Sequence, residues 1–218
     1  YCMPELTLII GNRNYSSWSL RPWILLRHLG LEFAVQQIPL DQADSTARIC
    51  AINPAGQVPV LRHGELLIWE SIAIGEYLCE LAGQGLPSER TARARARSVS
   101  AEMHSGFHAL RMQWPMNARA LGRRTAMSAA LQGDITRIDN IWCECRERHG
   151  ASGPWLFGDY SLADAMYAPV VLRFRTYDAQ LSAIAQQYMA TVLADGALLE
   201  WIAAAASAAP IFRRASKP

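Results

Sequence analysis

A proline inside an apolar, strand-like stretch is the first feature of this sequence that could serve chemistry. The stretch extends from Asn53 to Leu61 and reads Asn-Pro-Ala-Gly-Gln-Val-Pro-Val-Leu. Pro59 has no backbone N–H for a sheet ladder and restricts Val58 before it, so this step predicts an edge, a bend or a cis bond. With a cis bond, the N–H and C=O of Val58 would face outward, where a peptide-like ligand can pair with them as an added strand.

An acidic residue at a predicted helix start follows soon afterwards. Glu70 and Ser71 lead into apolar residues at helical spacing, which are Ile72, Ile74, Tyr77, Leu78 and Leu81. The free N–H groups and the dipole at a helix start favour a carboxylate, while the side chain of Glu70 can pair with an ammonium group. The pair therefore predicts a site for the α-amino acid end of a ligand.

Taken together, the Val-Pro step and the Glu-Ser pair resemble the glutathione transferase superfamily. In that family a cis-proline preceded by Val, and a Glu-Ser pair that opens the third helix, bind the tripeptide glutathione. The resemblance extends from about Leu6 to at least Ala209. It implies that glutathione is the co-substrate and that its site is formed by Gln57, Val58, Pro59, Glu70 and Ser71.

Two neighbouring serines, Ser16 and Ser17, are the candidates for the chemical step that the resemblance implies, which is stabilisation of the glutathione thiolate. A free thiol has a pKa of about 8.5, and lowering it by about two units requires about 2.7 kcal/mol of preference for the thiolate. One charge-assisted hydrogen bond contributes about 1.5 to 3 kcal/mol, and an adjoining helix dipole adds up to about 1 kcal/mol. A serine hydroxyl at a helix start is therefore sufficient.

The choice between the two serines stays open at this point. Serine-type members of the superfamily carry the donor a few residues before an Arg, which Arg21 matches, and this spacing favours Ser17. An alignment to the Ser-Ser-Cys motif of the zeta class favours Ser16 instead. Tyr15 is a rival donor, because other classes use a tyrosine hydroxyl in this loop. Either serine could also serve only as the cap of the first helix.

The segment Ser16–Arg21 is similar to the motif of the zeta class, whose members isomerise maleylacetoacetate. Trp18 stands where that class has its Cys. In the zeta class an Arg on the sixth helix receives a substrate carboxylate. Arg173 and Arg175 lie on the corresponding predicted helix, yet neither falls in register in the alignment, and this departure weakens the isomerase interpretation.

An electrophile pocket is expected between two domains, because domain interfaces commonly hold small ligands. Phe107, Arg111 and Trp114 lie at positions i, i+4 and i+7 of a predicted long helix and could receive an aromatic or anionic substrate. We expect Arg111 and Trp114 to bind substrate, with helix packing as the alternative. For Gln57 the alternative is an ordinary polar residue on a surface loop.

The elements that must hold these residues alternate between strand and helix over residues 1–82. Strands are expected at 6–10, 33–40, 58–61 and 65–68, and helices at 18–29, 44–52 and 70–81. The resulting order βαβαββα predicts a small mixed sheet with helices. This pattern matches the α/β thioredoxin-like, glutathione-binding N-terminal domain of the superfamily.

The remainder of the chain is predicted to be all-helical. Residues 83–87 contain Gly and Pro and are expected to form a linker, and residues 88–218 a C-terminal helical bundle domain. Helices are expected at 88–117, 125–149, 161–174, 182–194 and 197–206. Ser161 and Asp164 form an S-x-x-D capping box, to which we assign a structural role.

Composition limits the classes of partner. The net charge of +2 over 218 residues is too small to argue for nucleic acid, and no apolar stretch approaches the length of a membrane span. Five cysteines are an odd number without the spacing of a disulfide framework, which favours a reducing, cytoplasmic location. Cys143 and Cys145 have no matching Cys/His pair, so no metal is expected.

These features predict a cytoplasmic glutathione S-transferase that conjugates the glutathione thiolate to small electrophilic substrates. The resemblance implies a homodimer and a detoxification role. One alternative is a zeta-like, glutathione-dependent cis-trans isomerase of the maleylacetoacetate type. Another is a non-catalytic glutathione-binding or ligand-binding stress protein with the same fold.

Overall fold

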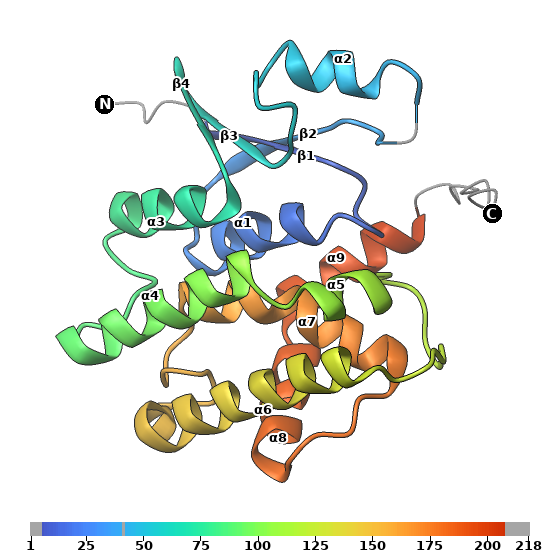
Figure 1. The fold of residues 1–218 in the computed structure, drawn as a ribbon. Helices are drawn as coiled ribbons and strands as arrows, with labels where there is room; N and C mark the ends of the chain where they lie inside the picture. The colour runs from blue at the N-terminus through green and yellow to red at the C-terminus, as the bar shows by residue number, and fades with distance from the viewer. Residues whose placement is uncertain (1–5, 41, 208–218) are drawn as a thin grey trace.

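A mixed four-stranded sheet occupies one end of the molecule, and a group of helices occupies the other (Figure 1). The computed structural model describes residues 6–40 and 42–207. The strand order is β2-β1-β3-β4, with β1 and β2 parallel and the other two pairs antiparallel. The strands are β1 (Leu6–Ile10), β2 (Phe33–Gln37), β3 (Val60–His63) and β4 (Leu66–Trp69). The predicted βαβαββα order is therefore confirmed.

The strands follow the apolar runs of the sequence, with shifts at two prolines. β1 is a continuous apolar run and is almost entirely buried. β2 was predicted to reach residue 40 but ends at Gln37, because Pro39 cannot donate to the sheet. β3 was predicted from residue 58 but begins at Val60, after Pro59, and it pairs with β4 around Gly64, whose φ is +58°. These two errors lie beside prolines, whereas β3 also continues two residues past its predicted end at Leu61, to His63.

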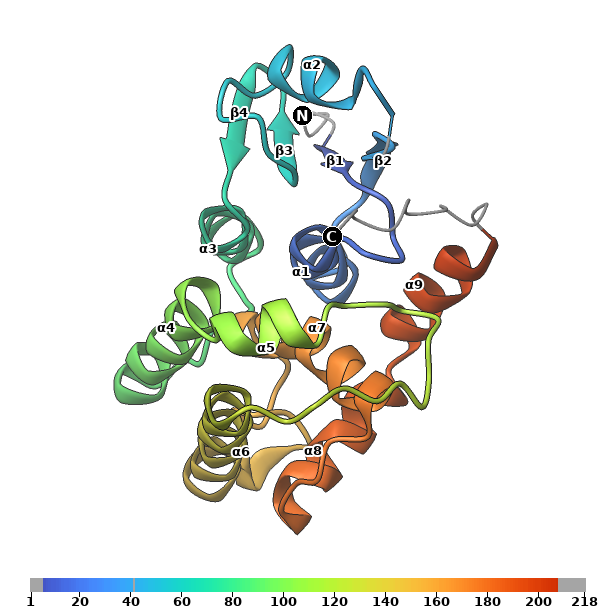
Figure 2. The same cartoon turned by 45° about the vertical axis from the view of Figure 1, so that its right-hand side comes forward.

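Three helices accompany the sheet. They are α1 (Ser17–His28), α2 (Ser45–Cys50) and α3 (Ser71–Ala82). Helix α3 ends at Gly83, which has a left-handed conformation with a φ of +63°. Figure 2 shows α1 and α3 between the sheet and the remaining helices. These helices begin at Ser17 and Ser71, so both predicted binding segments lead into helices that face the helical part.

The helical part contains α4 (Arg90–Ser105), α5 (His108–Gln113), α6 (Ala129–His149), α7 (Leu162–Tyr177), α8 (Ala183–Leu193) and α9 (Gly196–Ser207). The single helix predicted over residues 88–117 is wrong. It is broken at Gly106 and Phe107, where Phe107 has a φ of +59°. A Cβ atom at Gly106 would lie 2.8 Å from the carbonyl oxygen of Glu102, so the turn requires glycine there. The break redirects α5 and the residues after it.

Helix α7 is the centre of the helical core and is buried along nearly its whole length. Its N-terminus carries the predicted capping box of Ser161 and Asp164. The Asp164 carboxylate accepts hydrogen bonds from the N–H groups of Leu156 and Ser161 and from the hydroxyls of Ser161 and Tyr188, at 2.9–3.0 Å. Burial nevertheless raises the pKa of Asp164. This residue therefore joins three segments of the core, as its predicted structural role requires.

The two parts of the chain meet where α1 packs on α7 and α3 packs on α4 and α7. The apolar core runs through this boundary, from Leu8 and Leu61 of the sheet to Trp142 and Tyr167 of the helical part. Among the described helices, none alone is long and apolar enough to cross a membrane, and only α8 with α9, bent by 65° between them, passes that test as a pair.

Candidate functional site

A first pocket of about 300 Å³ lies beside Val58 and Pro59, and we call it the cis-proline pocket. The Val58–Pro59 bond is cis, as predicted. Among the described residues, the N–H and C=O groups of Val58 have no hydrogen-bond partner and can bind a ligand. The pocket is lined by Trp18, Leu40, Ile49, Gly56, Gln57, Val58, Pro59, Glu70 and Ser71. The structure thus brings together all five residues that the sequence assigned to glutathione.

Asn53 holds the loop that precedes this pocket. Its side chain is buried, and its Nδ2 donates to the carbonyl of Gln57 over 3.0 Å. Its Oδ1 accepts from the N–H of Ala55 over 3.1 Å. These two bonds close the turn that carries Gln57 to the pocket. The sequence placed Asn53 in the motif but gave it no role, although an Asn before such a turn is typical of this kind of local hydrogen bonding.

Glu70 and Ser71 occupy the junction between β4 and α3. Glu70 has a φ of +68°, a conformation that non-glycine residues rarely adopt and that often marks a functional position. Its side chain is 46% exposed and therefore accessible to a ligand. Ser71 begins the helix and is buried, and its Oγ accepts from Nη1 of Arg21 over 3.4 Å. Burial lowers the pKa of Arg21 well below its usual value, and Arg111 and Arg173 lower it further.

His104 of α4 reaches the same junction from the helical part. Its Nε2 lies 3.4 Å from Oε2 of Glu70, and its ring contacts the edge of Trp18. Burial lowers the pKa of His104, and the positive charges of Arg21 and Arg111 lower it further. The carboxylate of Glu70 raises this pKa but offsets only part of the decrease. The contact of His104 with Glu70 could be found only once α4 was placed beside α3.

The two serines have different surroundings. Ser16 is the N-cap of α1, since its Oγ accepts from the N–H of Ser19 and lies 2.7 Å from the Ser19 hydroxyl. Ser17 instead faces a second pocket, and its Oγ accepts a hydrogen bond from Nη2 of Arg173 over 3.3 Å. The capping alternative therefore describes Ser16. Ser17 keeps its own hydroxyl proton available for another acceptor.

The second pocket, of about 460 Å³, lies between α1 and the helical part, and we call it the arginine pocket. None of the described residues that line it is acidic, whereas three are arginines. The lining consists of Tyr15, Ser17, Trp18, Arg111, Pro115, Met116, Asn117, Arg123 and Arg173. Such a lining favours an anionic ligand, because the pocket supplies guanidinium groups without a carboxylate to neutralise them.

Two of the three arginines are fixed by backbone carbonyls. Arg111 donates to the carbonyls of Gly106 and His104, at 2.9 and 3.2 Å, and also to that of Met103. Burial lowers the pKa of Arg111, and Asp134 partly offsets the effect.

Arg173 donates to the carbonyl of Trp114 and, over 3.5 Å, to that of Arg111. Burial, followed by the charge of Arg111, lowers the pKa of Arg173 to about 10. Even so, Arg173 is protonated at neutral pH. Both arginines therefore present a fixed positive charge to the pocket.

Trp114 was expected in the substrate site, but the structure places its side chain in the core. The ring is buried, stacks on Tyr177 with centroids 5.1 Å apart, and donates through Nε1 to Thr125 over 2.8 Å. Only its carbonyl approaches the site, as an acceptor for Arg173. Phe107 is likewise buried at the break between α4 and α5. Of the predicted i, i+4, i+7 set, only Arg111 lines the pocket.

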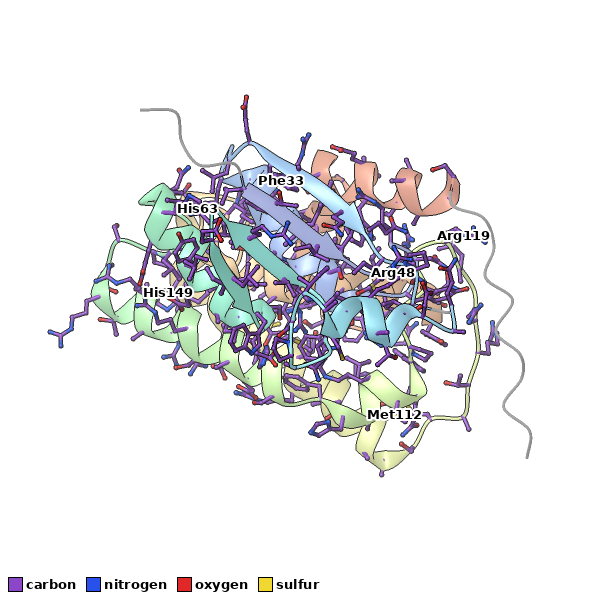
Figure 3. All side chains as sticks on the ribbon, turned by 90° about the horizontal axis from the view of Figure 1, so that it is seen from above. Phe33, Arg48, His63, Met112, Arg119 and His149 are labelled. Atoms are coloured by element: carbon purple, nitrogen blue, oxygen red, sulfur yellow. The ribbon has the colours of Figure 1, made fainter. Side chains whose placement is uncertain are left out.

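Arg173 is the main residue that sequence alignment missed, because neither arginine of the predicted helix fell in register. The structure separates the two clearly. Arg173 lines the pocket, whereas Arg175 is half-buried and donates to the carbonyl of Ala118. Met112, on α5, is 81% exposed and lies at the margin of the molecule in Figure 3.

Comparisons with known proteins find similarity to glutathione transferases. Residues 15–81 match the family model described as "Glutathione S-transferase, N-terminal domain". A probable maleylacetoacetate isomerase of Caenorhabditis elegans is 28% identical over 178 residues, covering 78% of this chain and 79% of the relative. Glutathione S-transferase 3 of Zea mays is 28% identical over 152 residues, covering 66% of this chain and 68% of that protein.

Solved structures share the fold. A bacterial maleyl pyruvate isomerase, described as a glutathione S-transferase of the zeta class, superposes with a TM-score of 0.72 at 22% identity, covering 93% of this chain and 100% of that chain. A glutathione transferase homologue from Burkholderia, with bound glutathione, gives a TM-score of 0.69 at 21% identity over 94% of this chain and 100% of that chain.

Proposed function

We propose that this chain, which belongs to the glutathione S-transferase family, joins the glutathione thiolate to a small electrophile that carries a negative charge. The observation that carries the proposal is the position of Ser17. Its hydroxyl faces the arginine pocket and accepts a hydrogen bond from Arg173, and the next residue, Trp18, lines the cis-proline pocket as well. A sulfur atom held between the two pockets would meet both the hydroxyl and the electrophile.

In this proposal the cis-proline pocket holds the tripeptide. The N–H and C=O of Val58 pair with the peptide backbone of glutathione as an added strand. The exposed carboxylate of Glu70 pairs with the α-ammonium of the γ-glutamyl group, and the N-terminus of α3 at Ser71 receives the α-carboxylate. Gln57 donates to a peptide end. These contacts leave the cysteinyl sulfur to point toward α1.

Ser17 then stabilises the thiolate. Because Arg173 already donates to its oxygen, the Ser17 hydroxyl can direct its own proton to the sulfur. The N-terminus of α1 and the guanidinium groups of Arg111 and Arg173 add positive potential at the same point. The thiol loses its proton to solvent, and the hydroxyl and the positive groups favour the anion that remains. Ser17 is therefore assigned the donor role, and Ser16 the role of helix cap.

The arginine pocket binds and orients the electrophile. A carboxylate of the substrate pairs with Arg111, Arg123 or Arg173, and this fixes the distance between its reactive carbon and the sulfur. The thiolate forms a carbon–sulfur bond as the leaving group departs with the bonding electron pair.

Isomerisation is the second candidate, and one observation favours it. Two firmly held arginines, Arg111 and Arg173, suit a substrate with two carboxylates better than a neutral aryl halide. In that reaction the thiolate adds to one carbon of a double bond, rotation occurs about the resulting single bond, and the thiolate leaves with the bonding pair. The relatives named as maleylacetoacetate and maleyl pyruvate isomerases also support this candidate.

A pair of serine variants tests the proposal. Purified protein is mixed with glutathione and either a chlorinated dinitrobenzene or maleylacetoacetate, and initial rates are recorded. Loss of one charge-assisted hydrogen bond predicts a fall of about 10- to 100-fold in kcat/KM for Ser17→Ala. Ser16→Ala should instead lower the free energy of unfolding by about 1 kcal/mol, with a small effect on the rate.

Three outcomes separate the functions. Turnover of the aryl halide supports the transferase, and turnover of maleylacetoacetate supports the isomerase. Wild-type protein that binds glutathione but turns over neither substrate would favour the non-catalytic binding role. A wild-type rate that is unchanged in Ser17→Ala and lost in Ser16→Ala would reverse the assignment of the two serines.

Two further expectations stay proposals. We propose a homodimer, supported by the exposed apolar side chains Leu66 and Trp69 on the edge strand β4, and light scattering on the purified protein would test it. We also propose two domains, at residues 1–82 and 88–218. The continuous core across α1 and α7 indicates that they unfold together, which a single thermal transition would support.

A further inference from the structure

Trp18 lies where the two pockets meet, and it lines both of them. It is the second residue of α1, directly after Ser17, and its side chain is only partly buried. On one side it borders a pocket of about 300 Å³ that contains Val58 and Glu70. On the other side it borders a pocket of about 460 Å³ that contains Arg111 and Arg173. No other described residue appears in both linings.

Side chains from three elements contact the indole ring. The guanidinium carbon of Arg21, from α1, lies 4.3 Å from the ring centroid, and that of Arg111, from α5, lies 4.6 Å from it. The ring of His104, from α4, meets it edge-on at 5.3 Å between centroids. Guanidinium groups at such distances are attracted to the π face of Trp, which is the most favourable aromatic partner for cations.

These contacts connect the indole to the binding groups of each pocket. Arg21 donates to Ser71, and His104 pairs with Glu70, so both belong to the side that would hold the amino acid end of glutathione. Arg111 belongs to the arginine pocket. A ring fixed by all three groups has little freedom to move. It therefore separates the two ligands at a constant distance and also supports the guanidinium group of Arg111.

We propose that Trp18 is a specificity-determining residue. Its indole forms the partition between the glutathione site and the electrophile site. It also holds Arg111 in the position from which this arginine selects anionic electrophiles. This inference rests on the proposed function. It predicts that the enzyme prefers small anionic electrophiles, whose reactive carbon can reach the sulfur past the edge of the ring. Electrophiles too bulky to pass the partition react slowly.

The test uses full-length Trp18→Ala and Trp18→Phe, with Pro115→Ala as the matched control. Pro115 lines only the arginine pocket, so its truncation enlarges that pocket without removing the partition. Glutathione affinity is measured by calorimetry. Anion selectivity is measured as the ratio of kcat/KM for 4-chloro-3,5-dinitrobenzoate to that for the neutral 1-chloro-2,4-dinitrobenzene.

Trp18→Ala should weaken glutathione binding by about fivefold and lower the anion selectivity by about tenfold, because both pockets lose a wall and Arg111 loses its aromatic support. Pro115→Ala should leave the glutathione Kd within about twofold of wild type, whatever its effect on the electrophile. A purely structural role for Trp18 would lower thermal stability and slow both electrophiles equally. The selectivity ratio distinguishes that case.

Trp18→Phe tests the partition role of Trp18 if the alanine variant fails to fold. A phenyl ring keeps an aromatic face but is smaller and attracts cations less, so the selectivity ratio should fall by about twofold to threefold. Wild-type protein that binds glutathione, with unchanged selectivity in both Trp18 variants, would overturn the partition and leave the proposed function standing. Wild-type protein that binds no glutathione would overturn both.

Discussion

The cis-proline pocket and the arginine pocket adjoin each other, yet they are built in opposite ways. Most of the cis-proline pocket comes from one short segment between Gly56 and Ser71, and its main binding groups are backbone atoms and one helix start. The arginine pocket is assembled from side chains far apart in the sequence. Its central hydrogen bond joins Ser17 and Arg173, which are 156 positions apart.

Their charges differ in the same way. In the cis-proline pocket the carboxylate of Glu70 lies beside His104 and close to the start of α3, so groups of both signs are available. This arrangement suits the zwitterionic end of an amino acid. In the arginine pocket the charged side chains among the described lining residues are all arginines. In the proposed function, the backbone-built pocket would hold glutathione and the side-chain-built pocket would select the electrophile.

Of the substitutions that affect one pocket and not the other, replacement of Arg173 should have the largest effect. Arg173→Gln deletes a guanidinium group that donates to Ser17 and that, in the proposed function, pairs with the electrophile, so kcat/KM for an anionic electrophile should fall by about 100-fold. The glutathione Kd should change by less than about twofold, because Arg173 does not line the cis-proline pocket. Steady-state kinetics and calorimetry measure the two quantities.

Arg175→Gln is the matched control, since Arg175 lies on the same helix and contacts the carbonyl of Ala118 outside the pocket. It should retain most of the wild-type rate. Equal losses of kcat/KM in the two arginine variants would show that α7 has only a structural role. Binding of the electrophile in the arginine pocket would then be contradicted.

Glu70→Gln should instead weaken glutathione binding and leave the chemical step unchanged. The variant would lose the proposed charge-assisted contact with the α-ammonium of glutathione, so the Kd should rise by about tenfold while kcat at saturating glutathione stays near the wild-type value. Glu65→Gln, at the exposed turn between β3 and β4, provides the control for charge alone. A fall in kcat with an unchanged Kd would place Glu70 in the chemical step rather than in binding.

The same contrast explains what the sequence could predict. Pro59, Glu70 and the capping box at Ser161 and Asp164 each depend on a few neighbouring residues, and the structure has them as predicted. Strand ends were less accurate beside Pro39 and Pro59, because the local effect of a missing donor outweighed the apolar pattern. Local patterns therefore predicted the sheet and its binding segment well.

Interactions between segments far apart in the sequence could not be predicted from local patterns. The break after Ser105 depends on the close approach of Gly106 to the carbonyl of Glu102, and it turns Trp114 into the core and Arg111 toward the pocket. Arg173 could be separated from Arg175 only by the rotation of α7 against α1. Which of Ser16 and Ser17 faces the pocket depends likewise on how α1 is packed, not on residue type.

The smallest expected effect concerns His104, the residue through which the helical part contacts the cis-proline pocket. Burial and the charges of Arg21 and Arg111 lower the pKa of His104 in the folded protein, and Glu70 offsets only part of this. The folded state therefore disfavours the protonated ring. As pH falls below the unfolded pKa of about 6.5, the unfolded state binds the proton first and the wild-type free energy of unfolding decreases.

His104→Gln keeps a polar side chain but cannot titrate, so its loss of stability over the same pH range should be smaller. Denaturant unfolding of both proteins between about pH 8 and pH 5 measures the difference, which should grow as the solution becomes more acidic. A constant difference would mean that Glu70 compensates the buried charge fully. In that case protonation of His104 would neither strengthen nor weaken the contact between α4 and the cis-proline pocket.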